Sequence, residues 1–306
     1  MIERLHPGEM ELTWISDAVL AVAFGFAVSL WLHLKWTRLT LSRAQREHIV
    51  LDAQLALAAE IQRGLLPSVP PDGDGVRWAA RLVQAGPIGG DLYDFVRLPG
   101  RRWLVLVGDV SGKGIPAALV LASIRTMFRM IATETSEPGE LVERISNRLF
   151  EDHRGMPYFT CLVLRVDAEH REVAYVNAGH PAGIVVGGAT PGCPPLLLAS
   201  SGPPAGFFAN QQYRTASVQV PEDAVAILVT DGITEAFDEL GLAIDHDSVA
   251  TLLAHIQRPP TPARICETLI DHTAPALLRH EWEDDRTVVA FALGGQPGVT
   301  PSPVSP

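Results

Sequence analysis

The chain opens with an apolar stretch long enough to cross a membrane as a helix. Residues 14–34 contain a single charge, Asp17, close to one edge. At about 1.5 Å per residue, a helix of this length spans roughly 30 Å, the thickness of the hydrocarbon core of a bilayer. Trp14, Trp31 and Trp36 lie where interfacial aromatic residues are expected. The pattern predicts a transmembrane helix over 14–34, with a buried core helix as the alternative.

The charges that flank this stretch predict its orientation. Residues 1–13 carry one arginine against three glutamates, whereas residues 35–46 carry four basic residues and no acid. Because basic flanks stay in the cytoplasm, we expect 1–13 to be a short extracytoplasmic segment and the rest of the chain to be cytoplasmic. A cleaved signal peptide is less favoured, since the first flank is not basic and no small-residue cleavage site is clear before Lys35.

A second helical pattern covers residues 35–66, which lack proline and contain one glycine. Its candidate seam has members alternately four and three residues apart: Ala44, His48, Leu51, Leu55, Ala58, Gln62 and Leu65. This spacing predicts a coiled coil that joins two copies of the chain as a homodimer and passes a signal from the membrane. Because the seam is short and two members are polar, an amphipathic helix lying on the following domain is the alternative.

Beyond this helix, the hydrophobic pattern changes to one that predicts strands. Strand-like runs begin at residues 76, 91, 102, 158, 171, 182, 224 and 287, and helical patterns cover 116–132, 140–153, 247–256 and 262–279. Successive strands joined by short turns predict antiparallel pairing, and therefore a layered α+β sandwich instead of a doubly wound sheet. We expect one domain over 67–294 and a disordered tail over 295–306.

Charge and cysteine content limit the classes of partner. The 306 residues carry a formal net charge of -11, which argues against a nucleic-acid partner held through its phosphates. The three cysteines form no C-x-x-C pair, so neither a zinc site nor a disulfide framework is indicated.

The heptapeptide GDVSGKG, residues 108–114, looks like a nucleotide-binding loop but has the wrong spacing. Three residues instead of four separate Gly108 from Gly112, and Gly114 stands where a magnesium-binding Ser or Thr is required. Asp109 would also repel phosphate oxygens unless a cation lay between them. The loop therefore favours Asp109 as a metal ligand over a nucleotide site, with a strand-to-helix turn capped by Asp109 as the alternative.

Acidic residues recur at strand ends and in glycine-rich turns. They are Asp91 in GGDLYD, Asp109 in GDVSGKG, Asp231 in TDGITEA, and the pair Asp284 and Asp285 in EDDRT. Each alone also fits a turn residue or a surface charge. Together, oxygen-only ligands at one edge of a sandwich suit Mg²⁺ or Mn²⁺. Two such ions bridged by carboxylates activate a water for attack on a phosphoryl group.

Six segments in order carry a family resemblance: GGDLYDF, GDVSGKGIPAAL, YFTCLVLRVD, YVNAGHPAG, LVTDGITEAFD and DDRTVVAFAL. Their order and spacing over roughly residues 50–294 resemble the bacterial SpoIIE/RsbU-type serine/threonine phosphatases, a branch of the metal-dependent PPM phosphatases. The resemblance implies an αββα four-layer sandwich. It also implies a dinuclear Mn²⁺ or Mg²⁺ centre at one end of the sheets.

By motif position, the resemblance also implies a ligand set. Asp109 would bridge both ions, and the carbonyl of Val110 would be a further ligand. Asp231 and Asp284 would complete the shell of one ion, and Asp91 would bind directly or through water. Asp285 is a further candidate metal ligand at this position.

Four polar residues near these motifs receive other interpretations. Ser111 and Lys113 are interpreted as residues that form the loop. His180 in the NAGH turn is interpreted as structural instead of as a general acid. Glu235 is expected to order the Asp231 segment without binding metal.

The resemblance implies a metal-dependent protein serine/threonine phosphatase. Together with the predicted span, this gives a membrane-anchored enzyme whose activity we expect to be set through the helix at 35–66. Its substrate would be a phosphorylated regulatory protein, an anti-sigma-factor antagonist of the STAS type. The alternative is a catalytically silent scaffold with the same fold. No acid of the metal motifs is missing, which argues against that alternative.

Overall fold

The computed structural model describes residues 7–70, 72–187, 195–222, 224–239, 261–273 and 284–294. The helix predicted over 247–256 and the tail at 295–306 lie outside the described residues. The chain divides into two compact units, Met1–Leu57 and Ala58–Pro306, and each is described by itself.

One long helix, α1 (Pro7–Leu65), provides the first unit and enters the second. The patterns at 14–34 and 35–66 are therefore parts of one helix. Within it, Val19–Leu41 is long and apolar enough to cross a membrane by length and composition, and none of it is buried. A signal sequence near an N-terminus passes the same test. This window overlaps the predicted span and extends it towards the basic residues.

The second unit contains two five-stranded antiparallel sheets, named here after their first strands. The β1 sheet has the order β1-β10-β9-β6-β7 and consists of β1 (Val76–Val83), β10 (Arg286–Leu293), β9 (Ala224–Val229), β6 (Gly183–Gly187) and β7 (Leu196–Leu198). The β2 sheet has the order β2-β3-β4-β5-β8 and consists of β2 (Asp91–Leu98), β3 (Arg102–Val110), β4 (Phe159–Asp167), β5 (Glu172–Ala178) and β8 (Ala216–Gln219). All their ladders are antiparallel, as predicted.

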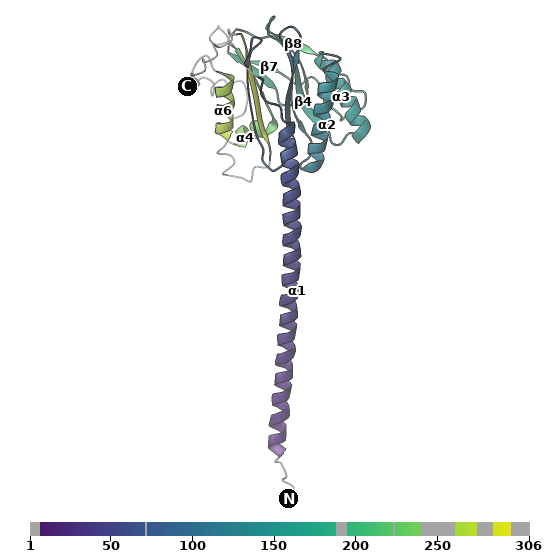
Figure 1. Ribbon diagram of the computed structural model, residues 1–306, viewed down its shortest axis with the longest axis vertical. Helices are drawn as coiled ribbons and strands as arrows, with labels where there is room; N and C mark the ends of the chain where they lie inside the picture. Colours follow the sequence, from purple (N-terminus) through teal and green to yellow (C-terminus); the bar gives the residue numbers. More distant parts are fainter. Residues whose placement is uncertain are drawn as a thin grey trace, which may run out of the picture. The chain divides into compact units, whose positions relative to one another are not determined.

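Helices cover the outer face of each sheet (Figure 1). The β2 sheet is covered by α2 (Ile115–Ile131) and α3 (Pro138–His153), and the β1 sheet by α4 (Asp231–Glu239) and α6 (Pro262–Thr273). A proline in the first turn begins both α2 and α3, where its missing N–H group has no helical partner to lose. The result is an αββα sandwich, which confirms the predicted fold class.

Residue alternation on the strands separates the core into three layers. On β3, Val105 and Val107 pack between the two sheets, whereas Leu104 and Leu106 pack beneath α2 and α3. A third cluster joins the β1 sheet to Ile233 of α4 and to α6. Because successive strand residues face opposite sides, a residue's place in the alternation decides which layer it enters.

Some elements differ from the sequence prediction. The strands β7 and β8 and the helix α4 were not predicted. The two strands are short, and the Asp231-Gly232 pair that begins α4 has the composition of a turn. The predicted helix over 262–279 is described only as α6, from Pro262 to Thr273.

Candidate metal centre

Asp91 and Asp109 lie directly opposite each other on neighbouring strands. The register of β2 and β3 pairs them, and directly paired residues place their side chains on the same face of a sheet. That face also carries Tyr93 and Val107, which belong to the core between the sheets. The two carboxylates therefore project into the space between the sheets, at its end.

Two threonines of the other sheet hold Asp91. The hydroxyl of Thr230, after β9, donates to Asp91 Oδ2 over 2.8 Å, and the hydroxyl of Thr287, in β10, donates to the same oxygen. The backbone N–H of Thr287 in turn donates to Thr230 Oγ1 over 3.0 Å. Asp91 is 3% exposed. This buried carboxylate thus joins the ends of the two sheets.

The remaining three acids come from the ends of two adjacent strands of the β1 sheet. Asp231 is the first residue of α4 and is separated from β9 by Thr230 alone, and Asp284 and Asp285 precede β10. A Cβ atom on Gly232 would collide with the carbonyl oxygen of Asp285. Glycine at this position lets the start of α4 approach the segment before β10, and this approach brings Asp231 to the Asp284-Asp285 pair.

Asp285 also contacts the segment that carries Asp91. Its Oδ1 accepts a hydrogen bond from the N–H of Ala85 over 2.9 Å, and its Oδ2 accepts one from the N–H of Asp91 over 3.4 Å. The acids of the two sheets are therefore connected by direct hydrogen bonds as well as by their common position.

Burial and mutual repulsion raise the pKa values of these acids. Burial raises the pKa of Asp91 well above its ordinary value, and repulsion from Asp109 and Asp285 adds to the rise. Burial raises the pKa of Asp109 to about 8, with repulsion from Asp231, Asp284 and Asp285. Burial and then the charge of Asp284 raise the pKa of Asp231. A bound cation stabilises such a cluster of carboxylates in the ionised form, because its charge offsets their mutual repulsion.

Oxygen donors of the β3 end converge over Gly90. A Cβ atom built on Gly90 would lie 2.5 Å from Asp109 Oδ1 and 3.1 Å from the carbonyl oxygen of Val110. Glycine leaves this space open, and carboxylate and carbonyl oxygens are the donors that Mg²⁺ and Mn²⁺ prefer. The residues present therefore fit such a metal. Among the described residues, no three His, Cys, Asp or Glu side chains form a group already arranged to hold an ion.

Ser111 holds the loop after β3 in place. Its N–H donates to the carbonyl of Tyr158 and its hydroxyl accepts from the N–H of Tyr158, both over 2.9 Å. Lys113, two residues further along, is exposed. On the neighbouring helix α4, Glu235 is also exposed.

His180 is buried behind the centre. Its Nδ1 lies 3.1 Å from the hydroxyl of Thr160, and its backbone N–H donates to Asn177 Oδ1 over 2.9 Å. Burial lowers the pKa of His180 to about 3. The imidazole is therefore neutral near pH 7, which argues against a role as a cationic general acid.

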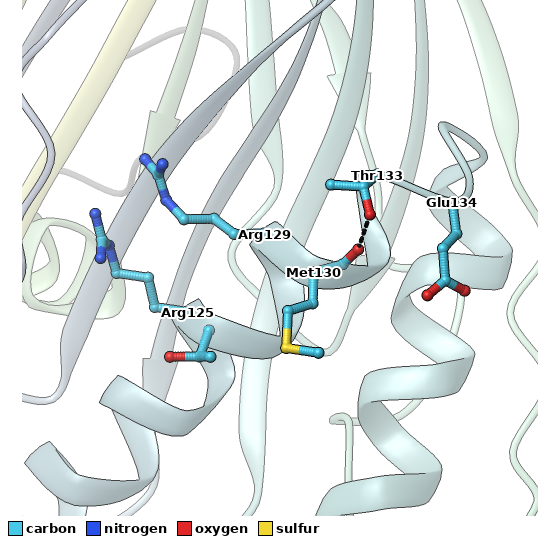
Figure 2. Close-up of a pocket in the computed structure, with 6 residues that line it drawn as sticks. Arg125, Arg129, Met130, Thr133 and Glu134 are labelled. Atoms are coloured by element: carbon cyan, nitrogen blue, oxygen red, sulfur yellow. Dashed lines mark hydrogen bonds between the residues drawn. The ribbon is translucent and has the colours of Figure 1, made fainter.

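A surface pocket along α2 is separate from the carboxylates. Figure 2 shows Arg125 and Arg129 on successive turns, with Met130 and Glu134 lining the same pocket. Both arginines bind Asp94, which lies on the helix-covered face of β2. The pocket thus belongs to the opposite side of the sheet from Asp91.

Several residues that support the centre were not predicted. Thr230 and Thr287 directly neighbour the acidic motifs, in TDG and DDRT, so their position was the available signal. Gln62 was placed in a coiled-coil seam. That assignment is wrong for the described structure, which buries Gln62 against Gly89 within the Ala58–Pro306 unit.

A comparison with protein families agrees with this architecture. The family model described as stage II sporulation protein E (SpoIIE) matches residues 99–293. The chain belongs to the SpoIIE family.

Two curated relatives are from Bacillus subtilis. Phosphoserine phosphatase RsbP is 29% identical over 186 residues, 60% of this chain and 45% of RsbP. Phosphoserine phosphatase RsbU is 23% identical over 242 residues, 79% of this chain and 69% of RsbU. The chain thus spans less than half the length of RsbP.

Solved structures show the same fold. The SiaA-PP2C domain of Pseudomonas aeruginosa superposes with a TM-score of 0.64 at 21% identity, covering 80% of this chain and 98% of that domain. RsbX, solved in complex with magnesium, gives a TM-score of 0.57 at 18% identity, covering 74% of this chain and 99% of RsbX. The fold is therefore that of PP2C phosphatases.

Proposed function

We propose that this chain is a metal-dependent protein serine/threonine phosphatase that hydrolyses phosphoserine or phosphothreonine on a regulatory protein. The observation that carries the proposal is the convergence of acids from both sheets, with raised pKa values, at one end of the sandwich. RsbP and RsbU, both named phosphoserine phosphatases, support the same chemistry.

The residues proposed to hold two Mn²⁺ or Mg²⁺ ions are Asp91, Asp109, Val110 through its carbonyl, Asp231, Asp284 and Asp285. When bound, such a pair supplies a Lewis acid and an activated water for attack on phosphorus. The threonine hydroxyls orient Asp91, and Gly90 leaves the oxygens of Asp109 and Val110 accessible. Because gathered carboxylates repel a phosphate group, binding of substrate requires the cations.

The proposed substrate is a phosphorylated partner in a sigma-factor pathway, an anti-sigma-factor antagonist of the STAS type. This part rests on the similarity to RsbP and RsbU. We also propose that the apolar part of α1 anchors the chain in the cell membrane, with the catalytic domain in the cytoplasm. The basic residues that follow the predicted span support this orientation.

We test the catalytic proposal with the full chain in detergent, using an aryl phosphate and a phosphoserine peptide. Activity is expected with Mn²⁺ and lost with a chelator. Asp109→Asn should lower turnover by roughly two orders of magnitude or more, since several kcal/mol of charge stabilisation depend on the metals. The matched control is Asp152→Asn, an exposed acid on α3 that pairs with Arg148. Equal activity in the two variants, or activity that survives the chelator, would contradict the proposal.

The anchoring and dimer proposals need separate measurements. Deletion of residues 1–34 should move the protein from the membrane fraction to the soluble fraction, and unchanged localisation would contradict the anchor. Leu51→Cys, in the seam of α1, should cross-link two copies more efficiently than Ala53→Cys on another face of that helix. Equal cross-linking at both positions argues against the predicted seam.

A further inference from the structure

A row of three side chains crosses the β2 sheet at the end that carries the acids. The register pairs Asp109 of β3 with Asp91 of β2 on one side and with Thr160 of β4 on the other. Directly paired residues place their side chains on the same face. That face of β4 also carries Leu162, which belongs to the core between the sheets. Thr160 therefore lies beside Asp109, on the side away from Asp91.

The hydroxyl of Thr160 contacts the buried imidazole of His180. Its Oγ1 lies 3.1 Å from Nδ1 of His180 and 3.5 Å from the carbonyl oxygen of Asp109. At the other edge of the ring, Nε2 is buried and has no partner of good hydrogen-bonding geometry among the described residues. Burial lowers the pKa of the ring, and the carbonyl of Val229 beside it acts in the opposite direction. Because a carbonyl can only accept, the proton of the neutral ring lies on Nε2, and Thr160 donates to Nδ1.

The side chain of Asn177 fixes the turn that presents His180. Asn177 is fully buried. Its Oδ1 accepts the backbone N–H of His180 over 2.9 Å, and its Nδ2 donates to the carbonyl of Leu198 over 3.1 Å. Asn177 belongs to β5 of the β2 sheet, whereas Leu198 belongs to β7 of the β1 sheet. The turn is therefore tied to both sheets, and the imidazole is held between them.

Both neighbours of Asp109 in the row are linked to one segment of the β1 sheet. Asp91 accepts the hydroxyl of Thr230. Thr160 reaches the preceding residue, Val229, through the imidazole. The residue after this segment begins α4 and is itself a proposed metal ligand. The imidazole is therefore one of two links that hold the end of β3 against the end of β9.

We propose that His180 is a positioning residue for the metal centre, where its neutral ring bridges Thr160 and Val229. This inference rests on the proposed function, because the strand ends joined by the bridge lead to the proposed ligands Asp109 and Asp231. Without the ring, the hydroxyl of Thr160 turns to the carbonyl of Asp109, and the two strand ends lose one of their links. Groups that orient metal ligands typically change metal affinity or activity 10- to 100-fold when they are removed.

The test measures binding of Mn²⁺ alone to the full chain in detergent. His180→Phe keeps an aromatic ring but removes both ring nitrogens. Titration calorimetry should give a dissociation constant about 10- to 100-fold higher than that of the wild type. The matched control is His170→Phe, at an exposed histidine whose Nδ1 lies 3.1 Å from Asp167. This control should bind Mn²⁺ like the wild type.

Two smaller changes test the contact between Thr160 and the ring. Thr160→Val removes the hydroxyl alone and should also raise the dissociation constant for Mn²⁺. Its effect should not add to that of His180→Phe in the double variant, because both changes remove the same contact. His180→Asn places a carbonyl oxygen near the position of Nδ1 and should bind Mn²⁺ more tightly than His180→Phe. If His180→Phe does not fold, Thr160→Val and His180→Asn provide the comparison.

A purely structural role gives a different pattern. Positioning predicts that the Mn²⁺ concentration for half-maximal activity rises in His180→Phe, whereas turnover at saturating Mn²⁺ returns towards the wild-type value. Nitrogen NMR of the wild type should find the ring proton on Nε2. Unchanged Mn²⁺ affinity in His180→Phe and Thr160→Val, whether or not the melting temperature falls, or a ring proton on Nδ1, would overturn the inference. If the wild type binds Mn²⁺ but hydrolyses no phosphoester, the proposed function fails, and calorimetry still decides the role of His180.

Discussion

Strand β2 carries two buried carboxylates, Asp91 and Asp94, whose neighbours carry opposite charges. Asp94 is 0% exposed and Asp91 is 3% exposed. Asp94 receives Nε and Nη2 of Arg129, each over 2.6 Å, and Nε of Arg125 lies 3.3 Å away. Asp91 receives threonine hydroxyls and lies beside Asp109 and Asp285. One acid has guanidinium partners, whereas the other has carboxylate neighbours.

The difference separates a structural acid from a functional one. Buried charges in proteins are paired or bind metals, because an isolated charge loses its hydration. Asp94 is paired within the fold, and its hydrogen bond raises the pKa of Arg129. Asp91 faces other acids, and burial raises its pKa, so its charge requires a further cation. Three positions along a strand are enough to move a carboxylate from one role to the other.

The largest expected effect is the loss of turnover in Asp91→Asn, compared with the separate variant Asp94→Asn. Asp91→Asn should lower turnover roughly a hundredfold or more, because it removes a proposed ligand. It should not lower the stability of the metal-free protein, since like charges repel there. Asp94→Asn should leave turnover within about twofold but lower the free energy of unfolding by about 1–3 kcal/mol. Steady-state kinetics and denaturant unfolding measure both. Unchanged turnover in Asp91→Asn, together with a large loss of turnover in Asp94→Asn, would contradict the functional role of Asp91 and the structural role of Asp94.

An intermediate effect is expected from the partner of Asp94. Arg129→Met leaves the carboxylate buried with only Arg125 and should lower the free energy of unfolding by about 2–3 kcal/mol, below the full cost of breaking a buried pair. The control is Arg144→Met, which removes exposed pairs with Glu134 and Glu140 and should cost less than about 1 kcal/mol. If Arg129→Met and Arg144→Met lowered the free energy of unfolding in urea by similar amounts, the ion pair of Asp94 would contribute no more to stability than an exposed pair.

A further effect, on the pH dependence of stability, is expected from Asp109 in the metal-free protein. A carboxyl group whose pKa is raised to about 8 in the folded state contributes stability that is fully present below its unfolded pKa of about 4 and is lost as pH rises through 8. Metal-free wild type should therefore lose stability from pH 4 towards 8, and Asp109→Asn should lose less. Thermal unfolding between pH 5 and 8.5 measures this slope, which Mn²⁺ should flatten. Identical slopes in wild type and Asp109→Asn would contradict the electrostatic account.

The strands and the acids at their ends could be predicted from the sequence because each pair lies within one short segment. The apolar runs of β3 and β9 end in Asp109 and, after Thr230, in Asp231, so both the strand and the chemical residue lie within one short window. Gln62 and Asp94 had no such window. Gln62 fits a helical seam by spacing, and Asp94 shares the GGDLYD segment with Asp91, so their partners decide their roles.

The sequence by itself determined the long strands and helices of the sandwich, the antiparallel α+β class and the identity of the acids at the strand ends. Hydrophobic periodicity and turn chemistry act within a few residues, and these features depend on nothing further. Tertiary structure alone decided which carboxylates meet, which one is neutralised by arginines, and that the end of α1 holds Gly89. Hydrogen bonds in this set join residues 27 to 194 positions apart, and only the packing of the sheets with each other, with α2 and with the end of α1 brings them within hydrogen-bonding distance.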